Sequence, residues 1–180
     1  MKLSKLGESM VGQPMFNILE RAQELERGGR KIYHFELGEP DFDTPSNIAN
    51  AAIKAIEAGN THYTPSSGLY ELKKAAAEAT AKSRGFLPSI SQVLVTPGAN
   101  SIIYLVIKCA VNPGEEVIVP DPGFPTYFSA IEACGAKAVG VRLKQENGFS
   151  ISPKDIERAI TPQTRLLILN SPSNPTGGVV

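Results

Sequence analysis

This sequence of 180 residues has no excess charge of either sign. It has two cysteines and two histidines, and it lacks long apolar runs. Lys plus Arg and Asp plus Glu both number 18, so the formal net charge is zero. That balance argues against a nucleic-acid-binding protein, which normally carries a basic stripe. The longest apolar stretch, residues 102–107, is too short to span a bilayer, and the N-terminus lacks the apolar core of a signal peptide. These absences predict a cytoplasmic protein that binds neither nucleic acid nor membrane.

The few cysteines and histidines do not form a recognisable reactive pattern. Cys109 and Cys134 lie in apolar stretches without metal-ligand spacing, and we expect both to be reduced, buried thiols. Neither His34 nor His62 is paired by pattern with a nucleophilic Ser or Cys, so a hydrolase triad finds no support.

Acidic residues gather in the segment EPDFDTP, where Glu39, Asp41 and Asp43 resemble paired acids. Asp43 is better explained as part of the cap of the helix that follows. No metal site is predicted there.

Hydrophobic spacing and turn residues predict an alternating order of elements. The expected helices cover residues 14–28, 44–58, 69–84, 98–111, 125–135 and 152–160, and the expected strands cover 31–38, 92–96, 116–120, 136–143 and 164–170. From residue 92 onward the order is β-α-β-α-β-α-β. This order predicts an α/β fold with a mostly parallel sheet and helices on both faces.

Ligands of open parallel sheets bind at the carboxyl ends of the strands, where three of the expected strands run into loops rich in Gly and Pro. After the first, Gly98, Ala99 and Asn100 open a helix whose free N–H groups favour an anion, although an ordinary strand-to-helix turn has the same composition. After the second, Phe124 is suited to stacking on a flat ligand, and a core aromatic is the simpler alternative. After the third, two prolines stiffen the loop that presents Asn174.

Two more positions are candidates for binding anions. Gly38 lies in a tight loop and is able to offer its backbone N–H to a carboxylate, or is a simple turn glycine. Tyr63 lies in a polar loop with a phenol that can reach an anion. Tyr127, one turn after Phe124, is expected to pack in the core.

Five segments in this order and spacing resemble the class I and II aminotransferases, and within them the aspartate aminotransferase branch. The segments are LGEPDFDTP, YTPSSGLYELK, VTPGAN, DPGFPTY and NSPSNPTG. These enzymes use pyridoxal 5'-phosphate on an aspartate aminotransferase-like fold. The resemblance therefore implies a protein that transfers an amino group between an L-amino acid and a 2-oxo acid, as a homodimer.

The resemblance also assigns roles to single residues. It implies that Gly98, Ala99 and Asn100 hold the cofactor phosphate. It implies that Phe124, where the family commonly has Trp or Tyr, stacks on the pyridine ring, and that Asn174 contacts the phenolic oxygen of the cofactor and the carboxylate of the substrate.

Two further roles come from the resemblance alone. Gly38 would donate its backbone N–H to the substrate carboxylate, and Tyr63 would reach the cofactor phosphate of the partner subunit.

The family's Schiff-base lysine would lie beyond Val180, and no lysine of this sequence matches its motif. We therefore expect an N-terminal part of the enzyme that is inactive and poorly stable alone, with residues 1–43 in the small domain and 44–180 in an incomplete large domain. Two alternatives keep the fold: a pyridoxal-phosphate-dependent β-lyase or synthase, and a ligand-sensing domain of a regulator. The amino-acid substrate is not predicted.

Overall fold

A computed structural model describes residues 2–9 and 13–180. The chain divides into two compact units: a sheet unit formed by the described residues of Met1–Glu36 with Gly98–Val180, and a helical unit, Leu37–Pro97. The elements are α1 (Lys5–Ser9), α2 (Pro14–Arg27), α3 (Ser46–Glu57), α4 (Tyr70–Arg84), η1 (Ile90–Gln92), α5 (Ala99–Ala110), β1 (Glu116–Asp121), α6 (Pro125–Ala133), β2 (Lys137–Arg142), η2 (Gln145–Asn147), α7 (Pro153–Ala159) and β3 (Thr164–Leu167). Among the described residues, no helix is long and apolar enough to cross a membrane.

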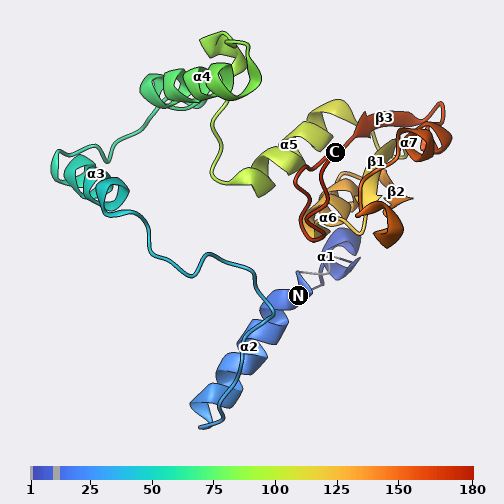
Figure 1. Cartoon of the computed structure of the whole chain (residues 1–180), viewed down its shortest axis with the longest axis horizontal. Coiled ribbons are helices and arrows are strands. Elements are labelled where there is room, and N and C mark those ends of the chain that lie inside the picture. The colour runs from blue at the N-terminus through green and yellow to red at the C-terminus, as the bar shows by residue number, and fades with distance from the viewer. Residues whose placement is uncertain (1, 10–12) are drawn as a thin grey trace. The chain divides into compact units, whose positions relative to one another are not determined.

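The three strands of the sheet unit form a parallel sheet in the order β2-β1-β3 (Figure 1). β1 and β2 pair without interruption from Glu116 opposite Lys137 to Asp121 opposite Arg142. The pairing of β1 with β3 contains an irregularity after Glu116. The predicted α/β class and the parallel direction of these strands are confirmed.

Side chains of β1 alternate between two hydrophobic cores. Val117 and Val119 are fully buried in a core that also contains Ile107 of α5 and Ile131 of α6. Ile118 points to the opposite face, into a core with residues of β2 and α7. Because β1 is buried on both faces, its sequence is a near-continuous apolar run rather than an alternating one. The predicted helices on both faces of the sheet are therefore confirmed.

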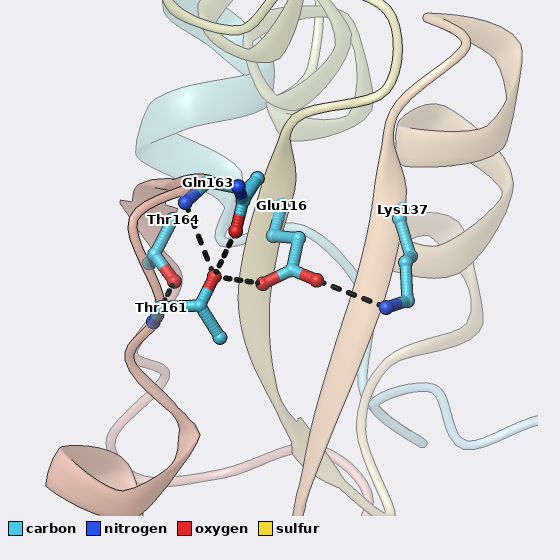
Figure 2. Close-up of polar contacts among 5 residues, drawn as sticks. All are labelled: Glu116, Lys137, Thr161, Gln163 and Thr164. Carbon is cyan, nitrogen blue, oxygen red and sulfur yellow. Dashed lines mark hydrogen bonds and ion pairs between the residues drawn. The ribbon is translucent and has the colours of Figure 1, made fainter.

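A polar network ties the amino ends of the three strands together (Figure 2). The Glu116 side chain, nearly buried, accepts hydrogen bonds from the Thr161 hydroxyl at 2.7 Å and from Lys137 Nζ at 2.9 Å. The backbone N–H groups of Gln163 and Thr161 donate to the Thr161 and Thr164 hydroxyls, respectively. Both hydrogen bonds to Glu116 favour its ionised form, so its pKa lies below the usual value.

Two predicted strands are wrong: residues 31–38 and 92–96 have no strand structure. A strand needs a neighbour to accept and donate its backbone hydrogen bonds, and neither segment pairs with a strand of the described chain. The Val95 N–H instead donates to the Ser67 carbonyl at 3.1 Å. Apolar and β-branched composition alone was therefore an insufficient signal.

Two smaller expectations also need correction. The helix after the EPDFDTP loop begins at Ser46, two residues later than predicted, and its N-cap is Pro45, so Asp43 does not cap it as expected. Cys109 is exposed on α5, whereas Cys134 is buried as expected. Hydrophobic neighbours in the sequence did not reveal that position 109 faces away from the core.

The two units meet in the chain after Glu36 and after Pro97. These divisions differ from the boundary predicted after Asp43. They describe contacts within this chain, and the assignment of residues 1–43 to a small domain and 44–180 to a large one stays a prediction.

Candidate cofactor site

The topology of the sheet unit brings three segments toward one edge of the sheet. α5 connects to the amino end of β1 through residues 111–115 and packs against α6 and β3. Its 12 residues extend about 18 Å, close to the length of a six-residue strand, so its first turn lies toward the carboxyl edge. The turn from β1 to α6 and the loop after β3 start at the same edge, because the strands are parallel.

The first segment is the start of α5. Gly98 is its N-cap, with φ 78° and ψ 159°, a conformation that is essentially restricted to glycine. The N-cap glycine makes no side-chain cap hydrogen bond, and Ala99 and Asn100 are exposed. First-turn N–H groups have no acceptor within a helix and carry the positive end of its dipole. This helix start is therefore chemically suited to a phosphate group.

The second segment is the turn from β1 into α6. A Cβ at Gly123 would overlap the carbonyl oxygen of Pro120, so only glycine fits there. Phe124 follows as the N-cap of α6, and Pro125 is the first helical residue. Phe124 is half-buried, and its ring contacts that of Tyr127 edge to face, with centroids 5.8 Å apart. As predicted, Tyr127 packs in the core, where burial raises the pKa of its phenol.

The third segment, residues 168–180, folds back on itself. The Ser173 N–H donates to the Gly178 carbonyl at 2.8 Å, and the Gly177 N–H donates to the Ser173 carbonyl at 2.7 Å. This closure leaves Asn174 exposed at the tip of the turn. The Ser173 hydroxyl is buried and has no hydrogen-bond partner within the described chain.

Hollows of the described surface are lined by neighbours of these segments. Ala99, Phe124 and Asn174 do not line any of five hollows in this described surface. The hollow beside the turn from β1 to α6 has a volume of about 380 Å³, and its lining residues include Leu6, Pro14, Gly123 and Phe128. The three segments thus share an edge of the sheet, and none of these five hollows joins Ala99, Phe124 and Asn174.

One contact near Phe124 was missed by the sequence interpretation. Gln13 Nε2 donates to Thr126 Oγ1 at 2.7 Å, although the two residues lie 113 positions apart. It fastens the segment before α2 to the first turn of α6. A glutamine before a helical proline gives no sequence signal for a contact at this distance.

The remaining candidates, Gly38 and Tyr63, belong to the helical unit. Gly38 is exposed, and a Cβ added there would meet no atom within 4 Å. Tyr63 is fully exposed. Their roles stay predictions, since both positions lack contacts that define a site.

Acidic and imidazole groups form no second site in the described residues. No group of three or more His, Cys, Asp or Glu side chains is arranged to hold a metal ion in that part of the chain. His34 contacts Glu36 at 2.6 Å and Glu26 at 3.1 Å, and these hydrogen bonds raise its pKa. Through these contacts, His34 links α2 to the segment that follows it, which is a structural role.

Comparison with known proteins gives a consistent result. The family model for aminotransferase class I and II matches residues 30–180. An arginine–pyruvate transaminase from Pseudomonas aeruginosa is 41% identical over 166 residues, which are 92% of this chain and 42% of that protein. An aspartate aminotransferase from Geobacillus stearothermophilus is 39% identical over 177 residues, which are 98% of this chain and 45% of that protein.

Solved structures agree with these relatives. The aspartate aminotransferase of Thermus thermophilus, solved with maleate, matches with a TM-score of 0.95 and 35% identity, covering 99% of this chain and 47% of that one. The chain thus spans less than half the length of these relatives. The resemblance seen in the five sequence segments is confirmed, and the chain belongs to the class I and II aminotransferases, with an aspartate aminotransferase-like fold.

Proposed function

We propose that the whole protein carrying this chain is an aminotransferase that moves an amino group between an L-amino acid and a 2-oxo acid, using pyridoxal 5'-phosphate. The family to which the chain belongs is pyridoxal-phosphate-dependent. One structural observation supports the proposal most directly. The start of α5, the Phe124 turn and the Asn174 loop all begin at the carboxyl edge of one parallel sheet.

The residues at this edge fit the parts of the cofactor. The first-turn N–H groups of Ala99 and Asn100 would donate to its phosphate, and Gly98 would let the backbone approach it. Phe124 would cover one face of its ring and exclude water there. The exposed amide of Asn174 would donate a hydrogen bond to its phenolic oxygen.

Bound pyridoxal phosphate supplies an electron sink for the negative charge that forms at Cα of the amino acid. The residues of this chain would bind the cofactor and orient its ring. None of its lysines matches the lysine motif of the family, so we expect the 180 residues alone to be inactive.

The roles of Gly38 and Tyr63 are proposed from the resemblance alone. The backbone N–H of Gly38 would donate to the carboxylate of the substrate. The phenol of Tyr63 would donate to the phosphate bound by a partner subunit, in a homodimer.

A product analysis on the whole protein tests this function. The relatives are named for aspartate and for arginine with pyruvate, so the purified protein is incubated with pyridoxal phosphate, pyruvate and either L-aspartate or L-arginine. We expect L-alanine to form in step with loss of the donor, and the 180-residue chain to form none. Ammonia release without alanine would indicate a lyase. Absence of any absorption change on adding pyridoxal phosphate would reject the cofactor assignment.

A further inference from the structure

Phe124, at the turn from β1 into α6, contacts a second aromatic residue. Its ring lies edge to face with the ring of Tyr127, at a centroid separation of 5.8 Å and an interplanar angle of 74°. The Tyr127 N–H also donates to the Phe124 carbonyl at 3.0 Å. Both the backbone and the ring of Phe124 are therefore tied to the same residue.

The two rings differ in how deeply they are buried. Tyr127 is 7% exposed and belongs to the core that includes Ile107, Val119 and Ile131. Phe124 packs against the margin of that core and remains partly exposed. An edge-to-face pair is favoured because the positive edge of one ring meets the negative face of the other. The buried ring of Tyr127 thus presents a fixed partner to the partly exposed ring of Phe124.

The backbone around Phe124 leaves the tilt of its ring to the side chains. Pro125 fixes the start of α6, and Gly123 passes so close to the Pro120 carbonyl that no side chain fits there. Glycine has no side chain and the proline ring is bonded to its own backbone nitrogen, so these two residues fix the position of the Phe124 Cα. Among the described residues, Tyr127 makes the one aromatic contact recorded for Phe124.

We propose that Tyr127 is a positioning residue that holds the plane of the Phe124 ring in the orientation needed for stacking on the cofactor. The inference rests on the proposed function, because it assumes that Phe124 covers the pyridine ring. The aromatic pair contributes through the ring of Tyr127 and not through its hydroxyl group. Loss of that ring is expected to weaken cofactor affinity roughly two- to tenfold, the range of an aromatic pair.

A double-mutant cycle on the whole protein tests the inference. The variants are Phe124→Leu, Tyr127→Leu and the double variant, with Tyr127→Phe as the conservative control. The dissociation constant for pyridoxal phosphate is measured for each apoprotein, together with the circular dichroism of the bound cofactor, which reports the orientation of its ring. Thermal unfolding verifies that each variant is folded, and Tyr127→Met replaces the leucine variant if that one unfolds.

The expected pattern is specific. Tyr127→Leu weakens binding and changes the dichroism, Tyr127→Phe changes neither by more than about twofold, and Tyr127→Leu has no further effect when Phe124 is already leucine. Equal losses in the phenylalanine and leucine variants at position 127 would assign the effect to the hydroxyl and overturn the inference. An undiminished effect in the Phe124→Leu background, or none at all from Tyr127→Leu, would also overturn it. If Phe124→Leu itself leaves the affinity unchanged, the proposed stacking is wrong.

Discussion

The Thr161 hydroxyl donates a 2.7 Å hydrogen bond to the carboxylate of Glu116, 45 residues earlier in the chain. Lys137 of β2 occupies the other oxygen of that carboxylate. A single side chain of β1 thus fastens β2 and the approach to β3 at the amino edge (Figure 2). The candidate cofactor site lies at the other end of the strands. A second carboxylate at this edge, that of Glu115, accepts a hydrogen bond from Arg165 Nε of β3 at 2.7 Å.

Acid should loosen this edge, and Glu116→Gln should remove part of that sensitivity, because hydrogen bonds from the Asn112 backbone and from Arg165 also lower the pKa of Glu115. Because the folded state lowers the pKa of Glu116, its contribution is complete above the unfolded value of about 4.3 and is lost as pH falls through the folded pKa. Hydrogen exchange of the β1 peptide at pH 5 and pH 3 measures the loss. Glu146→Gln, at an exposed position, is the matched control. An equal acid response in Glu116→Gln and the unaltered protein would contradict the prediction.

Gly123→Ala should destabilise the protein by about 1–3 kcal/mol, the range for a forced backbone shift. The new Cβ would overlap the Pro120 carbonyl oxygen, so the turn that carries Phe124 has to move. Chemical denaturation measures the cost. In the control, Gly38→Ala, the Cβ meets no atom within 4 Å, and the change should stay below about 0.5 kcal/mol. Similar costs for both variants would show that close approach does not explain Gly123.

Ser173→Ala should be neutral or slightly stabilising. The Ser173 hydroxyl is buried without a partner among the described residues, so its removal abolishes an unfavourable desolvation and breaks no recorded hydrogen bond. Thr161→Val is the contrasting variant, because it deprives the Glu116 carboxylate of a donor and should lower the stability of the protein. Denaturation of both variants is compared with that of the unaltered protein. A loss above about 1 kcal/mol for Ser173→Ala would mean that the hydroxyl has a partner in the whole protein.

Gly98→Ala should weaken cofactor binding, because φ 78° and ψ 159° strain any residue with a Cβ by about 1–3 kcal/mol. The strain would displace the first turn of α5, whose N–H groups are proposed to hold the phosphate. Titration of the apoprotein with inorganic phosphate isolates this part of the site. Ala99→Ser keeps the backbone N–H and the start of the helix, and should bind phosphate as the unaltered protein does. Unchanged phosphate affinity in Gly98→Ala would count against the helix start as the phosphate site.

Several elements that leave a local sequence pattern were predicted correctly, whereas contacts between distant residues were not predicted. The apolar run of β1 and the proline at the start of α6 were readable, because burial on both faces and helix initiation leave local patterns. Residues 92–96 have the composition of a strand but no partner, and pairing is a property of two segments. The bond from Gln13 to Thr126 joins distant positions without a motif, so it could not be predicted.

The candidate site shows the same division. Phe124 and Asn174 were singled out because glycine and proline surround them, whereas the tilt of the Phe124 ring relative to Tyr127 depends on three-dimensional packing. The spacing of three residues predicts proximity on a helix but no interplanar angle.

The unequal exposure of the two cysteines has a practical consequence. Cys134 is buried in the core, whereas Cys109 lies exposed near the end of α5, the helix whose first turn is proposed to hold the phosphate. A maleimide dye would therefore attach at Cys109 without any engineered substitution. The resulting fluorescent reporter would lie on α5 itself, about three helical turns from the proposed phosphate site.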